Sequence, residues 1–314
     1  MTWVGWRLQR TETLVAAAVL AALALLLVPE GLHMASAFRS GDVVACVPAR
    51  TPACGAAVSG FLDRFTFVRG VLDWLRLVPG LIGVLLAAPL VLELESGTHR
   101  LAWTQGVTRR RLLATKLGVA VVTCLLAAGA FSLLLTWCRA PLDRVIGRMV
   151  AGYFDVEWIV PLGWALFAFG LALAIGVAMR RTGVSLVVAF AAYVGCRILV
   201  DTQVRPHYLA PVTQRFALGG EPPSLGRDFV LSEHLVNATG RPFAITPQVV
   251  QTCSHFAGRG RGDCLVQHGA TYIQAIYQPA GRFWLFQGIE TALFGGVGLA
   301  LVALAALWLQ RRDA

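Results

Sequence analysis

The chain has 314 residues, of which 57% are hydrophobic and only 14% are charged. A soluble domain carries about 25% charged residues and does not use apolar runs of about 20 residues, which a bilayer requires, so a soluble globular enzyme is excluded. The formal net charge of +10 does not indicate nucleic-acid binding, because basic loops also set the topology of membrane proteins.

Six long apolar runs predict six membrane-spanning helices. They lie at residues 14–28, 78–92, 117–137, 159–179, 184–200 and 283–309. The first run could be mistaken for a secretory signal peptide. No small-x-small cleavage site follows the run before Pro29 and Glu30, so we interpret it as a retained span. The fold class expected is an all-α integral membrane protein with both termini on the same side.

The distribution of cations predicts which side that is. Eleven of the 27 Lys and Arg residues lie in short connections or at the two chain ends: Arg7, Arg10, Arg100, Arg109, Arg110, Arg111, Lys116, Arg180, Arg181, Arg311 and Arg312. Cytoplasmic connections carry an excess of cations, so both termini are expected inside. Three external segments follow, at about 29–71, 139–157 and 201–282. The last is rich in proline and glycine, which predicts a larger irregular loop of turns and short strands.

Cysteines in these external segments form two close pairs: Cys46 with Cys54, and Cys253 with Cys264. The exterior is oxidising, so we predict two structural disulfides. A metal site built from the second pair with His255 and His268 is the alternative. Zinc ligands normally come at tighter, repeated spacing, so we expect no metal.

Motifs for nucleotide binding and hydrolysis are missing from the sequence. A P-loop needs a lysine after glycine to reach the phosphates, but the sole lysine, Lys116, lies between Thr115 and Leu117. The sequence also lacks the GxSxG and HExxH signatures of hydrolases. We therefore expect no catalytic residue and no cofactor in this chain.

The connection between the second and third spans, ELESGTHRLAWTQGVTRRR at 93–111, is the most informative segment. It predicts an acidic end of the second span, a break at Gly97 and a short helix that stops at Gly106. A solvated basic loop would explain the arginines, but it requires neither Trp103 nor the acidic pair Glu93 and Glu95. We interpret the segment as a docking element for a cytoplasmic partner.

This segment resembles the corresponding loop of type-2 ATP-binding-cassette (ABC) exporter permeases. In that family Glu-x-Glu-x-Gly-Thr precedes a short helix and a basic stretch that ends in lysine. The string GTHRLAWTQ is especially similar to actinobacterial permeases. Two further stretches resemble the same group: the N-terminal Trp3, Trp6, Arg7 and Arg10, and QPAGRFW at 278–284, which leads into the last span.

The resemblance implies six spans, a dimer with a second copy or a homologous permease, and two ATPase subunits on the cytoplasmic side. ATP and magnesium would be bound in those partner subunits. The coupling helix would run from Gly97 to Gly106 and sit in a groove of the ATPase. The residues implied in coupling are Glu93, Glu95, Gly97, Thr98, His99, Arg100, Leu101, Trp103 and Thr104. The large last external loop departs from the smallest members of the family.

Three polar residues fall inside spans: Arg197 near the outer end of the fifth, and Gln287 and Glu290 early in the sixth. Charges in membranes are usually paired and often functional. Two hypotheses stay open, an Arg197–Glu290 structural pair and a role in a substrate pathway. A stripe of small residues in the sixth span suits close helix packing, within the fold or at a dimer seam: Ala292, Gly296 and Ala300.

These features predict that residues 1–314 form a single transmembrane permease domain of an ATP-driven ABC exporter in the plasma membrane. Its expected partners are ATPase subunits, a second permease and the lipid bilayer, with no nucleic acid. A membrane-embedded enzyme acting on lipid-linked substrates is the alternative, and a receptor-like sensor is a third. Such an enzyme would use the last external loop, with His207, His234, His255 and Asp263. It would have no need of a docking element around Trp103, which favours the permease.

Overall fold

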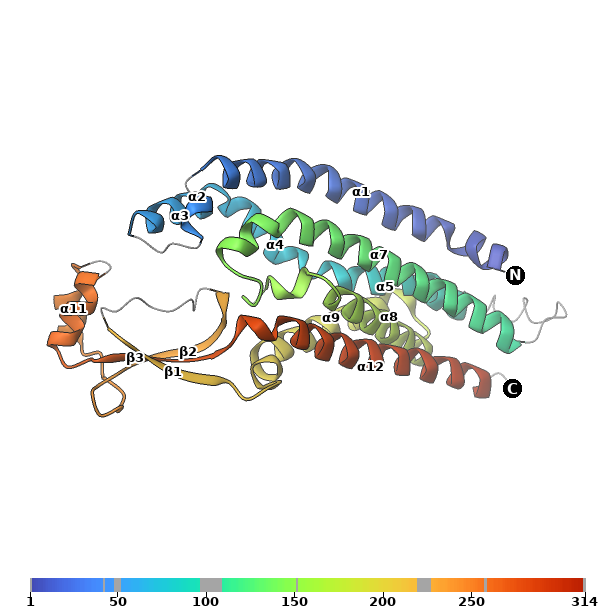
Figure 1. The fold of residues 1–314 in the computed structure, drawn as a ribbon. Helices are drawn as coiled ribbons and strands as arrows, with labels where there is room; N and C mark the ends of the chain where they lie inside the picture. Colours follow the sequence, from blue (N-terminus) through green and yellow to red (C-terminus); the bar gives the residue numbers. More distant parts are fainter. Residues whose placement is uncertain are drawn as a thin grey trace. The chain divides into compact units, whose positions relative to one another are not determined.

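A computed structural model describes residues 2–41, 43–47, 52–96, 109–150, 152–218, 227–256 and 259–312. The chain divides into two compact units, which are treated separately below. The membrane unit comprises Met1–Val145, Gly152–Val200 and Trp284–Ala314, and the sheet unit comprises Ile146–Ala151 and Asp201–Phe283. Figure 1 shows long helices in the first and a small twisted sheet in the second.

The membrane unit is built from helices of very different lengths. Their bounds are α1 (Thr2–Ser40), α2 (Val43–Cys46), α3 (Pro52–Arg64), α4 (Thr66–Leu75), α5 (Val78–Ser96), α7 (Arg109–Val145), η1 (Phe154–Val156), α8 (Val160–Met179), α9 (Thr182–Leu199) and α12 (Phe283–Arg312). The chain ends lie at the same end of this unit as the end of α5 and the start of α7 (Figure 1).

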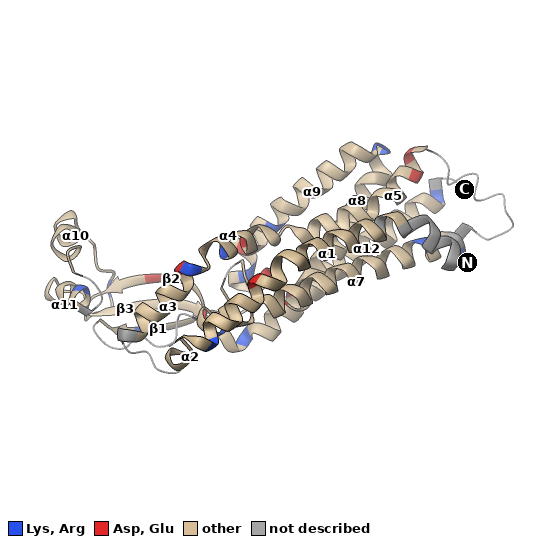
Figure 2. Cartoon of the chain, turned by 90° about the horizontal axis from the view of Figure 1, so that it is seen from above, with Lys and Arg blue, Asp and Glu red and all other residues tan. Residues whose placement is uncertain are grey.

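Among the described residues, six helical stretches are long and apolar enough to cross a membrane, which confirms the predicted number of spans. They are Thr13–Ser40, Thr66–Ser96, Leu113–Val145, Val160–Met179, Thr182–His207 and Ala280–Arg311. Figure 2 shows the middle portions of the long helices largely without charged residues. With no water in the bilayer core to bond the backbone, such stretches satisfy their peptide groups internally as helices.

The central helix of the membrane unit is α8. Its own residues are apolar on every face, and 67% of an 18-residue window within it is buried, as expected for a helix without a polar face. Pro161 lies in its first turn, where a missing N–H costs no helical bond. It ends at Arg180, whose left-handed backbone (φ 51°) lets its N–H bond to the Gly176 carbonyl.

Glycines bring α5 and α12 into close contact with α8. A Cβ atom at Gly83 of α5 would lie 2.7 Å from the Phe169 backbone nitrogen and even closer to the Ala165 carbonyl. A Cβ at Gly298 of α12 would lie 2.5 Å from the Leu166 carbonyl oxygen. Small residues permit this approach of helix backbones, which is how helices gain packing energy in a bilayer.

Two stretches differ from the sequence expectation. The first span was expected to end before Pro29, but α1 continues through Pro29 to Ser40. Transmembrane helices tolerate proline because neighbouring groups satisfy the freed carbonyl. Most of the described part of the remaining segment, which was expected to be an external loop at 29–71, is also helical, as α2, α3 and α4. The Cys46–Cys54 disulfide joins α2 to α3.

The segment at 139–157, expected to be external, is mostly buried. Helix α7 runs on to Val145, and residues 152–157 return into the membrane unit through η1. Every residue from Gly152 to Glu157 is buried, including the carboxylates of Asp155 and Glu157. Arg139, Asp155 and Glu157 are paired inside the protein, whereas Arg144 and Arg148 are exposed.

The sheet unit holds a three-stranded antiparallel sheet in the order β1-β3-β2. Its strands are β1 (Val212–Ala217), β2 (Phe229–Val236) and β3 (Tyr272–Gln278), and its short helices are η2 (Val200–Val204), η3 (Arg205–His207), α10 (Pro247–Cys253), α11 (Arg259–Gln267) and η5 (Ala280–Arg282). The Cys253–Cys264 disulfide joins α10 to α11. Both disulfides join the cysteines that were predicted to pair from their positions in the sequence.

Candidate functional site

The acidic end of α5 is tied to the beginning of α7 by one ion pair. Lys116 Nζ donates to Glu93 Oε2 at 2.7 Å, and both side chains are partly buried. Glu93 lies in the last turn of α5, and Lys116 lies in the second turn of α7. The sole lysine of the chain therefore links the two helices that flank residues 97–108.

A second carboxylate ties α5 to α9. The backbone N–H of Thr182, the first residue of α9, donates to Glu95 Oε2 at 2.8 Å. The preceding residue, Arg181, makes no side-chain cap, so α5 supplies the acceptor that the helix start needs. A carboxylate also suits the positive end of the helix dipole. In Figure 2 the acidic end of α5 lies beside the basic turn between α8 and α9.

The remaining residues predicted to couple the chain to an ATPase lie outside the described residues: Gly97, Thr98, His99, Arg100, Leu101, Trp103 and Thr104. Of the residues predicted to couple to an ATPase, Glu93 and Glu95 are therefore the two that the structure describes. Their two bonds join α5, α7 and α9 at the end of the bundle that holds the connection.

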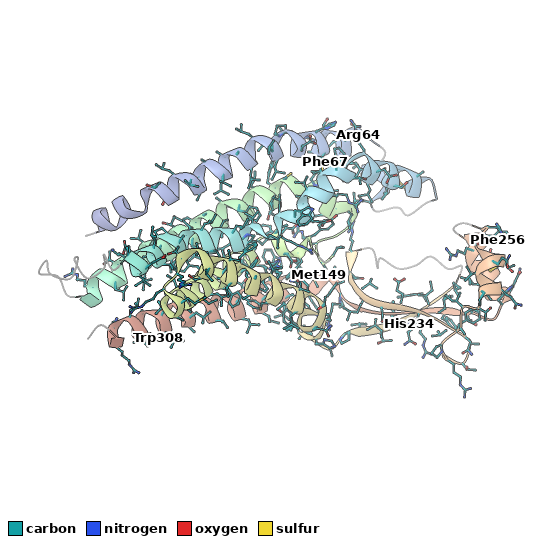
Figure 3. All side chains as sticks on the ribbon, turned by 180° about the vertical axis from the view of Figure 1, so that it is seen from behind. Arg64, Phe67, Met149, His234, Phe256 and Trp308 are labelled. Carbon is teal, nitrogen blue, oxygen red and sulfur yellow. A yellow bond between two sulfur atoms is a disulfide. The ribbon has the colours of Figure 1, made fainter. Side chains whose placement is uncertain are left out.

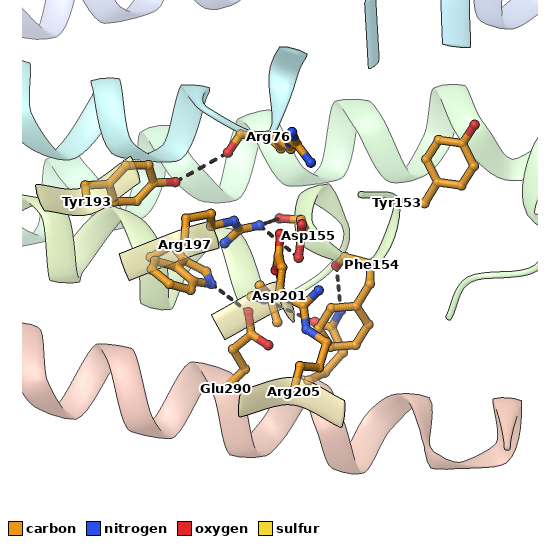
Figure 4. Close-up of polar contacts among 12 residues, drawn as sticks. Arg76, Tyr153, Phe154, Asp155, Tyr193, Arg197, Asp201, Arg205 and Glu290 are labelled. Carbon is orange, nitrogen blue, oxygen red and sulfur yellow. Dashed lines mark hydrogen bonds and ion pairs between the residues drawn. The ribbon is translucent and has the colours of Figure 1, made fainter. Parts of the chain in front are cut away.

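A group of buried polar residues lies between η1, α8, α9 and α12. Arg197 of α9 is 2% exposed, and its Nη2 lies 2.9 Å from Asp155 Oδ1, whose side chain is fully buried (Figure 4). Arg197 Nη2 also donates to the Asp155 carbonyl at 3.4 Å. Burial of this cation is therefore accompanied by an ion pair and a hydrogen bond, as such a site requires.

The indole of Trp164 joins Arg197 to Glu290. The Arg197 guanidinium carbon lies 4.5 Å from the centroid of the Trp164 ring. Trp164 Nε1 donates to Glu290 Oε1 at 2.7 Å, and Glu290 is fully buried. The hypothesis of a direct Arg197–Glu290 ion pair stays a prediction. Asp155 pairs with Arg197, and the indole connects that cation to Glu290.

Gln287 is fully buried and holds the beginning of α8. Its Oε1 accepts hydrogen bonds from the backbone N–H groups of Ile159 (3.2 Å) and Val160 (3.1 Å). Its Nε2 donates to the Phe154 carbonyl at 3.1 Å. The amide thus satisfies donors at the start of α8 and a carbonyl of η1, which is a structural arrangement.

Arg139 of α7 is a buried cation that the sequence analysis missed. Its Nη2 lies 2.8 Å from Asp143 Oδ1, and its Nη1 pairs with Glu157. Nη1 also donates to the Tyr153 carbonyl at 2.9 Å, and the guanidinium carbon lies 4.2 Å from the Tyr153 ring centroid. The signal in the sequence was the acidic pair Asp155 and Glu157 inside an aromatic, apolar stretch that leads into the fourth span.

A comparison with known protein families shows which family this chain belongs to. The sequence model of a family described as ABC-2 membrane transporter related matches residues 17–205, more than half of the chain. The chain belongs to this family. No curated protein and no solved structure gives a significant match.

The matched residues of this ABC-2 family member cover five of its six spans, from α1 through α9. Membership and the six apolar helices make this chain a multi-pass membrane protein of the plasma membrane and the membrane component of a transporter. The sixth span and most of the sheet unit lie beyond the matched residues. The narrower likeness to actinobacterial permeases stays a prediction.

The polar residues inside this ABC-2 protein line no open path in the described structure. Arg197 is 2% exposed, and Gln287 and Glu290 are fully buried. Their burial favours a structural role over direct contact with cargo, which requires access from an open cavity. The substrate-pathway hypothesis stays a prediction.

The stripe of small residues in α12 faces away from the rest of the membrane unit. Ala292, Gly296 and Ala300 are exposed, and no described atom lies within 4 Å of a Cβ placed at Gly296. The packed face of α12 carries Phe294 and Gly298 instead. The stripe therefore does not serve packing within the described fold.

The alternative metal site is not supported by the sheet unit. Cys253, Cys264 and His268 bring their ligand atoms within 4.8 Å of one another. The two sulfur atoms are joined in a disulfide. Zinc binds the thiolate form of cysteine, so these sulfurs are committed to the covalent bond.

Proposed function

We propose that this ABC-2 family member is the permease subunit of an ATP-driven exporter, energised by separate ATPase subunits at its cytoplasmic face. The excess of arginine and lysine at the chain ends and short connections supports this orientation. ATP and magnesium would be bound by the partner subunits. A second copy or a homologous permease would complete the pathway.

The observation that carries the proposal is the pair of carboxylate bonds at the end of α5. Glu93 holds Lys116 of α7, and Glu95 holds the first N–H of α9. A displacement of residues 97–108 by an ATPase would act directly on α5 and α7, which they connect. The two bonds would carry the same displacement to three helices together.

Close packing would extend the motion to the centre of the unit. Gly83 of α5 lies against the backbone of α8, and α8 lies against α12 at Gly298. Tightly packed helices move as bodies rather than deforming continuously. A force applied at the connection would therefore reach α8 and α12 through backbone contacts. Alternating conformations of a permease pair would follow from such a movement.

Co-purification tests the docking part of the proposal. Trp103→Ala should weaken ATPase binding about 30-fold, since truncation of an interface tryptophan commonly costs about 2 kcal/mol or more. Gly97→Pro should also release the ATPase. The measurement is the amount of ATP-binding subunit retained by the tagged chain after detergent extraction. Full retention by both variants would contradict the docking assignment.

Glu93→Ala and Glu95→Ala separate coupling from docking. They should retain the ATPase but reduce cargo-dependent stimulation of ATP hydrolysis, because alanine offers no acceptor to Lys116 or to the Thr182 N–H, and α7 or α9 then no longer follows α5. Glu233→Ala is the matched control, since Glu233 is an exposed carboxylate in β2 of the sheet unit. Unchanged stimulation in both α5 variants would show that the two bonds do not transmit the motion.

The rival enzyme is less well supported by the sheet unit. His207 lies in η3, His234 in β2, His255 directly after α10, and Asp263 in α11. All four side chains are exposed. Figure 3 shows His234 on the strands, apart from Phe256, which follows α10 in the sequence. A general acid or base needs a site that positions it and shifts its proton affinity, and four exposed residues on separate elements do not form one.

A further inference from the structure

A groove of about 310 Å³ lies between α1 and α7. The two helices are in close contact at Gly31, where an added Cβ would lie 2.9 Å from Trp137 and 3.2 Å from Cys138 Sγ. Cys138 Sγ also donates to the Leu27 carbonyl at 3.4 Å. The groove begins at this contact and follows both helices toward Arg39 and Arg144.

Its walls are apolar. They are formed by Gly31, Leu32, Ala35, Phe38, Trp137, Ala140 and Pro141. Leu32 is 55% exposed and Trp137 is 48% exposed, although both belong to helices that span the membrane. Such walls suit an acyl chain that lies lengthwise between the helices.

Two arginines stand at the mouth of the groove. Arg39 lies in the last turn of α1, and its Nε donates to the Ala35 carbonyl at 3.1 Å. The Arg144 guanidinium carbon lies 5.6 Å from the Phe38 ring centroid. Three carboxylates lie on the same helices: Asp143 pairs with Arg139, Glu30 lies more than two turns before Arg39, and Glu12 lies near the start of α1. The mouth is therefore a cationic site above an apolar wall.

The depth of these residues matches the layers of a bilayer. Trp137 follows Leu117 by 20 residues, or about 30 Å of helix, which is the thickness of the hydrocarbon core. Tryptophan favours that interface. Arg144 lies about 10 Å further along α7, and Arg39 lies in the last turn of α1, beyond the apolar run of that helix. The arginines thus lie at headgroup level, and the walls lie beside Trp137 at the boundary between the headgroups and the acyl chains.

We propose that this groove binds one anionic phospholipid. Its phosphate lies between Arg39 and Arg144, where guanidinium groups bond phosphate oxygens in pairs. One acyl chain runs along Leu32, Ala35 and Trp137. The anionic headgroup and the acyl chain of this lipid are inferred from the groove alone. The proposed orientation of the permease would place the lipid in the outer leaflet, and that placement rests on the proposed function.

Native mass spectrometry of the full chain with added lipids tests this site. The protein should retain phosphatidylglycerol in preference to phosphatidylcholine. Arg39→Gln with Arg144→Gln should reduce that preference about tenfold or more, since each arginine near a membrane surface contributes about 1 kcal/mol. Arg64→Gln with Arg241→Gln removes the same charge at exposed positions outside the groove and should leave the preference unchanged.

A second variant distinguishes a groove from diffuse surface charge. Ala140 is exposed and lines the groove, so Ala140→Phe fills it while keeping both arginines and the fold. It should also lose the bound phosphatidylglycerol, with an unchanged thermal unfolding midpoint. The proposal is overturned if Ala140→Phe retains the lipid, if the double arginine variant retains it, or if the wild-type chain binds both lipids equally.

Discussion

At Trp164 three interactions meet on one buried indole. Phe294 stacks on the ring with centroids 3.9 Å apart, the Arg197 guanidinium lies over it, and its N–H bonds to Glu290. A tryptophan that is fully buried needs a partner for its N–H, and a buried cation gains from the face of the ring. One side chain thus accommodates a cation and a carboxylate in an apolar interior.

The identity of the partner of Arg197 leads to a prediction. Asp155→Asn should lower the free energy of unfolding by about 3–5 kcal/mol, because it leaves the buried guanidinium without its carboxylate. Glu290→Gln should cost only about 0.5–1.5 kcal/mol, because the amide oxygen can still accept from Trp164. Equilibrium unfolding in detergent measures both, with Glu233→Gln as the exposed control. Equal costs would instead support a direct Arg197–Glu290 pair.

For single residues, the sequence could predict which polar side chains of the fifth and sixth spans would need partners inside the protein, but not what those partners are. Arg197, Gln287 and Glu290 stood out because charged and amide groups are costly in a bilayer. Asp155 did not, since it falls in a charged stretch that also fits a solvated loop. Only the return of residues 152–157 into the membrane unit brings it to Arg197.

Among the elements, α8 depends most on glycine contacts. Gly83→Ala in α5 should destabilise the membrane unit by about 1–3 kcal/mol or more, because the new methyl group meets the backbone of α8. Gly129→Ala in α7 is the matched control, since nothing lies within 4 Å of its Cβ position. That change should be neutral or stabilise the helix by about 0.5–1 kcal/mol. Thermal unfolding in detergent compares the two, and equal effects would contradict the packing assigned to α8.

The elements themselves could be predicted well where apolar runs are uninterrupted. The predicted fourth span, 159–179, differs by one residue from α8, and the predicted fifth, 184–200, is close to α9. Helix ends beyond the bilayer were missed, because α1 continues past Pro29 and α7 continues through Pro141. Hydrophobicity predicts how much chain lies in lipid, whereas a helix can continue into the headgroup region without an apolar signal.

For the whole molecule, six spans place both chain ends at the same end of the membrane unit as the connection between α5 and α7 (Figure 1). Family membership rests on residues 17–205 and therefore on the spans next to that connection. The side chains that would contact an ATPase were predicted from a motif and lie outside the described residues. The architecture is thus shown, and the docking of an ATPase on it is the central claim to test.

Site-specific photocrosslinking tests that claim most directly. Benzoylphenylalanine placed at Trp103 in the full chain, in native membranes, should crosslink to a subunit that carries a P-loop. The same group at Phe256, which is 52% exposed in the sheet unit, should give no such product. An ATP-binding subunit captured from position 103 alone is the predicted result. Capture from position 256 and not from position 103 would contradict the account.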